Sequence, residues 1–463
     1  MKTVDVGQLL DEGRWSFYQK LLIFGTALTI ILDGIDNQLL GNAIPLMMKD
    51  WSVARGAFSN VLFVGPIGMM FGGLFGGMLG DRIGRRSALL FSVIAFAVLT
   101  LAIAYSDGIP MLGVLRFLSG LGLGGAMPNA AALSSEYVPK RKRAFAVTLT
   151  IICIPLGGFV AAFLSKKVLP VYGWHTLFIL GGIIPIVLAV ILFKVLPESP
   201  RYLAGRRERW PELIKLLRKL GHDLPADVAF AETGPAEKGI SKATAVGDVL
   251  APMETRGYGG NTSAKSASIR DLFNKAFRRD TIGLFGSFFF CLMANYIGIQ
   301  LLVVMLTGAG FTQPDASGAL QNWNLGGVGG ALLGAFLIQQ MGSRITMLGM
   351  SAISIGCAIL LTTMAMDPKS IPLTIMLVLL GGLMNAVQTT MYALAANVYP
   401  TAIRGTGIGT AVAIGRIGNA MAGYVGNSAL DHGGPPTYFW SFAVTMGLVL
   451  VSLAIVKRHI ERH

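Results

Sequence analysis

Twelve apolar segments, each at least 20 residues long, run through this chain of 463 residues. An α-helix of about 20 apolar residues crosses a hydrocarbon core of about 30 Å, and only helices or closed barrels satisfy their backbone polar groups in lipid. The sequence therefore predicts an all-α membrane protein with twelve transmembrane helices in two six-helix bundles. We expect the helices at residues 21–48, 57–80, 87–106, 110–135, 144–165, 174–196, 280–307, 316–340, 344–366, 370–396, 404–428 and 437–457.

The distribution of charge predicts the topology. Charged residues make up 13% of the chain, against about 25% in soluble domains. With the helices placed as above, the loops on one side carry 30 Lys and Arg residues and the opposite loops carry 5. Because cytoplasmic loops are enriched in Lys and Arg, both termini and the central loop are predicted to be cytoplasmic. The net charge of +14 then needs no nucleic-acid partner.

The chain carries no pattern typical of catalysis or of a bound cofactor. Its three cysteines, Cys153, Cys291 and Cys357, lie in apolar runs and lack the spacing of metal ligands. The glycine-rich run 65–77 has no phosphate-binding context, and we interpret it as a helix-packing segment. We therefore expect no enzymatic activity, no cofactor and no metal site.

The helices divide into two sets of six. An N-terminal bundle is expected at 1–196, a cytoplasmic linker at 197–279, and a C-terminal bundle with a cytoplasmic tail at 280–463. Within the linker, residues 211–220 predict a short amphipathic helix, and the Gly, Ala, Ser and Thr-rich segment 247–268 is predicted to be flexible.

The two halves also resemble each other in sequence. The fourth helix ends at Pro139 with Arg143 four residues later, and the tenth ends at Pro400 with Arg404 four residues later. A parallel repeat of two six-helix halves is an architecture of secondary transporters, whose binding site lies between the halves near the bilayer midplane. The pattern thus predicts a central site between the bundles.

Two carboxylates, Asp33 and Asp36, interrupt the first apolar segment. Ionisable groups at that depth are costly, usually face a protein interior or an aqueous cavity, and mark ion or substrate paths. Their i, i+3 spacing places both on one helical face. We predict that they take part in proton coupling; the alternative is a structural pairing with a neighbouring helix.

Arg416 is the matching basic residue in the second half. It lies twelve residues past Arg404, or about 18 Å further along a helix. A guanidinium at that depth matches a carboxylate, so Arg416 is predicted to bind substrate or couple charge; the alternative is a structural partner for an acid. Further candidate substrate contacts are amides and aromatic side chains within the apolar spans, which alternatively serve as helix-packing groups: Gln38, Asn129, Tyr296, Gln300, Gln321, Asn322, Trp323, Asn385, Gln388 and Tyr392.

Two short motifs resemble those of the major facilitator superfamily. One is the run from Gly77 to Arg86 between the second and third helices, and the other is Pro197–Arg201 after the sixth. In that superfamily these loops fasten the cytoplasmic side during alternating access. The resemblance implies a gating role for a set of charged residues, with anchoring in the membrane as the alternative: Asp81, Arg82, Arg85, Arg86, Arg116, Glu136, Arg143, Glu198, Arg201 and Arg404.

Three further segments are similar to the aromatic acid:proton symporters of that superfamily. They are Asp33-Gly34-Ile35-Asp36-Asn37-Gln38 in the first helix, Arg116 to Tyr137 in the fourth, and Tyr399 to Gly418 in the eleventh. The family commonly has a tryptophan–proline pair late in the seventh helix, whereas this chain has neither residue there.

The resemblance implies proton-coupled import of small aromatic carboxylates, such as hydroxybenzoates or phenylpropanoid acids, by a monomer in the cell (inner) membrane. The expected partners are the aromatic acid, protons and the lipid bilayer. The alternatives are a porter of the same fold for a sugar, nicotinate, an organic ion or a drug. A membrane receptor would need a folded cytoplasmic output domain, for which residues 197–279 are too short.

Overall fold

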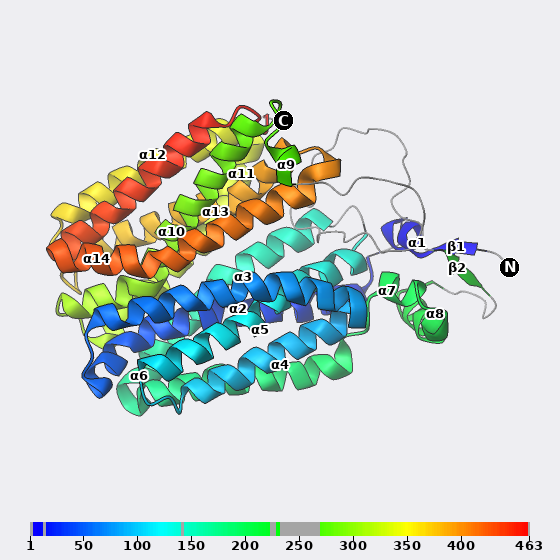
Figure 1. Cartoon of the computed structure of the whole chain (residues 1–463), viewed down its shortest axis with the longest axis horizontal. Helices are drawn as coiled ribbons and strands as arrows, with labels where there is room; N and C mark the ends of the chain where they lie inside the picture. The colour runs from blue at the N-terminus through cyan, green and yellow to red at the C-terminus, as the bar shows by residue number, and fades with distance from the viewer. Residues whose placement is uncertain (1–2, 13–14, 140–142, 223–227, 232–268, 462–463) are drawn as a thin grey trace.

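The computed structural model describes residues 3–12, 15–139, 143–222, 228–231 and 269–461. Long helices form two bundles that lie side by side, with both termini at the same end of the molecule (Figure 1). The first bundle contains α2 (Phe17–Trp51), α3 (Phe58–Ile83), α4 (Arg85–Ile103), α5 (Ile109–Tyr137) and α6 (Arg143–Val195). The second contains α10 (Arg278–Gly308), α11 (Gln313–Met341), α12 (Ser343–Thr363), α13 (Ile371–Val398) and α14 (Thr401–Ile455).

Two of these helices are each long enough for two membrane spans. The α6 helix has 53 residues and breaks at Gly173, whose φ of 74° is in the left-handed region that favours glycine. The α14 helix has 55 residues and breaks at Gly433 and Gly434. Nine helices in the described part of the chain, these two included, are long and apolar enough to cross a membrane. Together with α11, they supply the twelve spans expected from the sequence.

Small residues allow the helices of each bundle to pack closely. A Cβ atom built on Gly34 of α2 would overlap the carbonyl oxygen of Ile154 on α6. The reciprocal contact is equally tight, because a Cβ on Gly157 of α6 would overlap the carbonyl of Ile31. Such backbone-to-backbone approach fixes the segment of α2 that carries Asp33 and Asp36 against the first half of α6.

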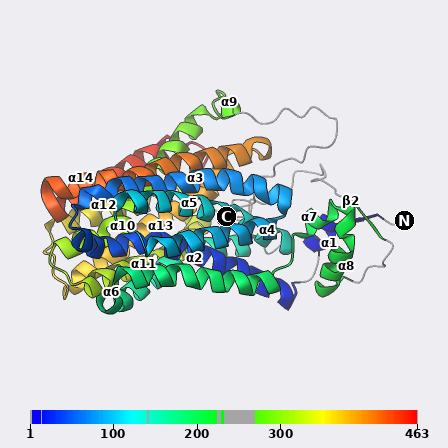
Figure 2. The same ribbon diagram turned by 60° about the horizontal axis from the view of Figure 1, so that its bottom comes forward.

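The short elements α1 (Val6–Glu12), β2 (Ala229–Ala231), α7 (Pro200–Ala204) and α8 (Trp210–Lys219) lie together beside the N-terminus (Figure 2). Strand β1 (Thr3–Asp5) pairs in parallel with β2, and α1 follows β1. The linker forms α7 and α8, and α9 (Ile269–Leu272) precedes the second bundle. One single turn of 3-10 helix, Arg207–Arg209, precedes α8, and another, Arg55–Ala57, lies between α2 and α3 at the opposite end of the molecule.

The α8 helix lies where the sequence predicts an amphipathic helix. Its apolar side, formed by Leu213, Leu216 and Leu217, is buried, and Lys215 and Arg218 are exposed. The segment 247–268, predicted to be flexible, lies outside the described residues.

Hydrogen bonds join the two bundles toward the end of the molecule opposite the termini. Between α2 and α11, the side-chain amides of Gln38 and Asn324 donate to each other at 2.7 and 2.8 Å. One turn further along α2, the Oδ1 of Asn42 accepts from the Ser317 hydroxyl at 2.9 Å.

The α3 and α14 helices meet in the same way near that end of the molecule. The Nδ2 of Asn427 donates to the Ser59 hydroxyl at 2.9 Å, the Tyr424 hydroxyl donates to Asn60, and Arg55 pairs with Asp431. These contacts close the bundle interface at the end away from the termini.

Candidate functional site

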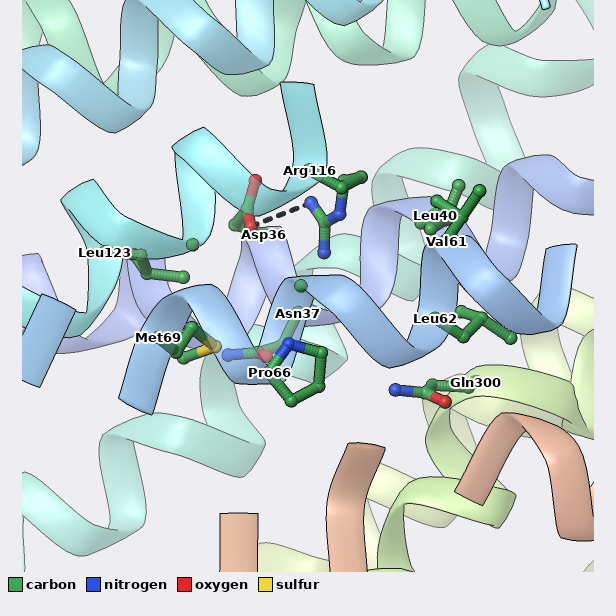
Figure 3. Close-up of a pocket in the computed structure, with 12 residues that line it drawn as sticks. Asp36, Asn37, Leu40, Val61, Leu62, Pro66, Met69, Arg116, Leu123 and Gln300 are labelled. Carbon is green, nitrogen blue, oxygen red and sulfur yellow. Dashed lines mark hydrogen bonds and ion pairs between the residues drawn. The ribbon is translucent and has the colours of Figure 1, made fainter. Parts of the chain in front are cut away.

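Asp36 of α2 is held in a buried ion pair. The Nη1 of Arg116 on α5 lies 3.0 Å from Asp36 Oδ2, and the Thr100 hydroxyl on α4 donates to Asp36 Oδ1 at 3.0 Å. The side chains of Arg116 and Asp36 are 11% and 4% exposed, so the pair is largely removed from solvent. Both carboxylate oxygens therefore have a partner, and side chains of three helices meet at this one group; Figure 3 shows the pair of Asp36 with Arg116.

Asp33, one turn earlier on α2, has a different environment. It is 5% exposed, and its Oδ1 accepts a hydrogen bond from Asn37 Nδ2 at 3.0 Å. Among the described residues, no cation lies within 4.0 Å of its carboxylate. Two acids three residues apart thus differ in their partners: Asp36 has a fixed counter-ion and Asp33 has only an amide.

Arg416 of α14 faces these acids from the second bundle. Its Nη1 donates to the Sδ of Met69 on α3 at 3.4 Å, which is its one hydrogen bond to another described residue. Its charge acts electrostatically on Asp33, on Tyr296 of α10 and on Tyr392 of α13. A thioether is a weak acceptor, so the guanidinium has no strong partner in the described part of the chain. An acid of the first bundle and a base of the second therefore share one interior region.

A small cavity lies between the bundles beside the ion pair (Figure 3). Its walls include Asp36 and Asn37 of α2, Met69 of α3, Arg116 of α5 and Gln300 of α10. The cavity volume is about 20 Å³, enough for a water molecule. An aromatic acid does not fit in this cavity, and Arg416 is not among the residues that line it.

The amides predicted as substrate contacts separate into groups. Gln38 forms the pair with Asn324 between the bundles, and Gln300 lines the cavity and donates to Asn419 Oδ1 at 3.4 Å. Asn129 donates to the carbonyls of Gly76 and Gly125, both at 2.8 Å, and so joins α3 to α5.

The remaining amides lie on α11 and α13. Asn385 donates to the carbonyl of Gly381 within its own helix at 2.9 Å. Gln321, Asn322 and Gln388 are partly buried, and none of them lines the cavity.

The predicted aromatic contacts also differ in position. Tyr296 and Tyr392 are partly buried within reach of the Arg416 charge, and Tyr392 meets Phe288 edge-on at 5.2 Å between ring centroids. Trp323 is fully buried against the backbone of Gly381 and lies 5.8 Å from the Phe442 ring. Its environment is that of a packing residue of the second bundle.

Most of the charged residues predicted to gate the protein lie at the end that carries the termini. Arg85 pairs with Asp81 at 2.5 Å. Glu198 accepts from the backbone amides of Arg86 and Ser199 at 2.8 and 3.0 Å, and Glu136 accepts from the Ser199 hydroxyl. These contacts fasten the loop between α3 and α4 to the segment after α6.

That set has five other members. Arg82 and Arg201 are exposed, and Arg404 Nε donates to the Tyr399 carbonyl at 3.2 Å. The Arg143 side chain lies outside the described residues. Arg116 does not lie with the rest of the set, because its partner is Asp36 at the cavity.

Sequence reasoning missed three residues that complete the site. Thr100 binds Asp36, Asn42 joins the bundles, and Asn419 meets Gln300. Asn419 lies three residues after Arg416 on α14, so the i, i+3 spacing of one helical face was a signal that could have found it. Thr100 and Asn42 carry no comparable signal, because small polar residues are common in membrane helices.

Comparison with known proteins identifies the family. The sequence profile of the Major Facilitator Superfamily matches residues 26–423 and 284–463. The gallate transporter of Pseudomonas putida is 30% identical over 94% of this chain and 91% of its own length. The 4-hydroxybenzoate transporter PcaK of Pseudomonas aeruginosa is 31% identical over 100% of this chain and 97% of its own. The benzoate transport protein of Acinetobacter baylyi is 28% identical over 99% and 94%.

Solved structures agree on the fold. The xylose transporter XylE from E. coli, in a partially occluded inward-open conformation, superposes with a TM-score of 0.70 at 16% identity, covering 94% of this chain and 97% of that one. A bacterial homologue of the lysosomal transporter Spinster, inward-facing, gives 0.67 at 15% identity, covering 96% and 97%. With the profile match and the full-length relatives, these likenesses establish that the chain belongs to the Major Facilitator Superfamily and is a transporter, not an enzyme.

Proposed function

We propose that this transporter imports small aromatic carboxylates together with protons by alternating access. The observation that carries the proposal is the state of Arg416: a guanidinium inside the bundle interface whose described hydrogen-bond partner is only the Met69 sulfur. A planar guanidinium binds a carboxylate through two parallel hydrogen bonds. The anionic group of the substrate would complete this site.

The aromatic part of the proposal draws on two supports. Tyr296 and Tyr392 are within electrostatic range of Arg416, and their rings would pack against the aromatic ring of a bound acid. The relatives named above are transporters of gallate, 4-hydroxybenzoate and benzoate, and this chain aligns with them along almost its whole length. A niacin transporter of Acinetobacter baylyi is more distant, at 26% identity.

Asp33 is the better candidate for the proton-binding group. Asp36 already has Arg116 and Thr100 as partners, so neutralising it would leave a buried guanidinium without its counter-ion. Asp33 has no such partner among the described cations, so it can gain and lose a proton without disrupting an ion pair. We therefore assign proton binding to Asp33 and a positioning role to Asp36 and Arg116.

The charge of the loops supports the proposed membrane orientation. The loops on the side of the termini carry 30 Lys and Arg residues and the opposite loops carry 5, so both termini would face the cytoplasm. We propose that the protein works as a monomer in the inner membrane. The hydrogen bonds between the bundles, such as Gln38–Asn324, would then close the outer side.

Uptake into proteoliposomes tests the proposal. Labelled benzoate, 4-hydroxybenzoate and gallate should accumulate when the pH gradient is directed inward, and nicotinate and xylose serve as competing cargoes. Arg416→Gln should weaken binding of the acids roughly tenfold to a hundredfold, the range for a hydrogen bond between charged groups. Arg416→Lys keeps the charge without the planar guanidinium, so its affinity for the acids should lie between those of the wild type and Arg416→Gln.

The Asp33→Asn variant separates proton coupling from transport of the carboxylate. This variant should lose accumulation driven by the pH gradient and still exchange labelled for unlabelled acid. Gradient-driven accumulation at the wild-type rate by Asp33→Asn would overturn the proton assignment. Stronger binding of xylose than of the acids would overturn the substrate class.

A further inference from the structure

A groove on the outer surface of the first bundle lies away from the transport site. It runs between α3 and α4 with α5 as its floor, and its volume is about 470 Å³. Its lining is apolar apart from Ser92 and Arg82. Phe75 and Met78 of α3 and Phe91 of α4 project at its rim and are 63%, 52% and 62% exposed. In a membrane-spanning bundle such exposed apolar side chains face lipid.

Glycines form the floor of the groove. Gly122 and Gly125 of α5 pack closely on α4, where a Cβ atom would overlap Phe96 and Ser92, and Gly72 and Gly76 of α3 pack directly on α5. The resulting channel extends along α3 from Gly72 to Arg82, ten residues or about 15 Å. That length is half of a hydrocarbon core of about 30 Å, which is the depth of one leaflet.

Positive charge gathers where the groove reaches the end of α3. The carbonyl of Arg82 accepts hydrogen bonds from the Tyr202 hydroxyl at 3.1 Å and from Arg206 Nη2 at 2.6 Å. Arg206 also stacks over the Tyr202 ring at 4.5 Å, so the segment after α7 holds a second guanidinium beside Arg82.

Nearby acids are already neutralised by other residues. Asp81 pairs with Arg85 at 2.5 Å, and Glu212 pairs with Arg209 at 2.8 Å. Within the described part of the chain, neither Arg82 nor Arg206 has a carboxylate within 4.0 Å. Near the mouth of the groove, two guanidinium groups therefore have no carboxylate partner among the described residues, although Arg206 already donates one hydrogen bond to the Arg82 carbonyl.

We propose that this groove binds one anionic phospholipid of the leaflet on the side of the termini. One acyl chain lies in the channel between Phe75 and Phe91, and the phosphate lies between Arg82 and Arg206. The apolar channel of one-leaflet length, together with uncompensated positive charge at headgroup depth, is the complement of such a lipid. The site does not depend on the proposed substrate, since no residue of the transport site lines it.

Native mass spectrometry of the whole protein, released from nanodiscs of equal phosphatidylglycerol and phosphatidylethanolamine, tests the proposal. The wild-type protein should retain more phosphatidylglycerol than phosphatidylethanolamine. Since each basic residue near a membrane surface contributes roughly fivefold to binding an anionic lipid, Arg82→Gln and Arg206→Gln should each reduce that preference by about this factor. Arg82→Lys should preserve it, as should Lys194→Gln, which removes an exposed cation on α6 outside the groove.

A second variant tests the channel separately from the charge. Ala95 of α4 lines the groove, and Ala95→Phe should fill the channel and reduce retention of both lipids. Equal retention of phosphatidylglycerol by wild type and both glutamine variants would overturn the headgroup site. Undiminished retention by Ala95→Phe would overturn the chain site. Displacement of the lipid by soluble glycerol phosphate would overturn the lipid assignment in favour of a free-anion site.

Discussion

The Asp36–Arg116 ion pair gives the sharpest test of the site. Asp36→Asn keeps the shape of the side chain and the hydrogen bond from Thr100, and it leaves Arg116, whose side chain is 11% exposed, without a counter-ion. Removing one partner of a buried pair costs about 3 to 5 kcal/mol. Asp33→Asn breaks no ion pair among the described residues, and it should cost at most about 1 kcal/mol, the worth of an ordinary hydrogen bond.

These costs convert to measurable melting temperatures. With an unfolding entropy of about 2.1 cal/mol/K per residue over 463 residues, Asp36→Asn should lower the melting temperature in detergent by about 3 to 5 °C and Asp33→Asn by about 1 °C or less. Combining Asp36→Asn with Arg116→Met removes the unpaired charge and should recover most of the loss.

The double variant decides whether the ion pair is the cause. If Asp36→Asn with Arg116→Met melts as low as, or lower than, Asp36→Asn alone, the unpaired guanidinium is not the source of the instability. If Asp33→Asn and Asp36→Asn melt at the same temperature, the different environments of the two acids have no energetic consequence. Either result would refute the division of roles between them.

Three further predictions test packing, the bundle interface and the tail. Gly68→Ala should destabilise the protein by about 1 to 3 kcal/mol because its Cβ would overlap the Phe117 carbonyl, whereas Gly77→Ala on the same helix meets nothing within 4 Å and should cost nothing in the same thermal assay. Gln38→Ala removes both hydrogen bonds to Asn324. At about 1 kcal/mol each, their loss should let the bundles separate more readily, and a cysteine at Ser317 should be alkylated about 30-fold faster. Burial lowers the pKa of His459. Below the usual histidine pKa of about 6.5, the unfolded chain therefore binds a proton that the folded chain resists, and stability is lost as pH falls. His459→Gln should reduce the drop in melting temperature between pH 7.5 and 5.5.

The sequence could predict the spans because length and hydropathy decide them. The positions of Asp33, Asp36 and Arg416 were also readable, since an ionisable group in an apolar run is conspicuous. Their partners were not readable. Arg116 and Thr100 come from α5 and α4, and helical periodicity says which residues share a face but not which helix that face meets.

For the aromatic residues, too, the sequence does not say which side chain packs within a bundle and which lies near the proposed site. From sequence, Trp323 and Tyr296 are equal candidates for stacking on a substrate ring. The structure packs Trp323 against Gly381 and Phe442 and leaves Tyr296 beside the charge of Arg416. The pairing of β1 with β2 was likewise beyond prediction, because two three-residue strands more than 200 positions apart carry no periodic signal.

The proposed site also determines the electrical character of transport. Asp36 and Arg116 cancel each other. In the proposed empty site, an ionised Asp33 would balance the charge of Arg416 and leave the interior without net charge. A bound carboxylate alone would add one negative charge, and a proton alone would add one positive charge; either uncompensated charge is costly in the membrane interior. Only both together, or neither, leave the interior neutral while the bundles rearrange.

One proton per monoanion is then the favoured stoichiometry, and accumulation should respond to the pH gradient and not to membrane potential. A net charge moved with each cycle would change accumulation about 50-fold per 100 mV, so a potential set with potassium and valinomycin at equal pH separates the two cases. Accumulation driven by that potential alone would refute the balance.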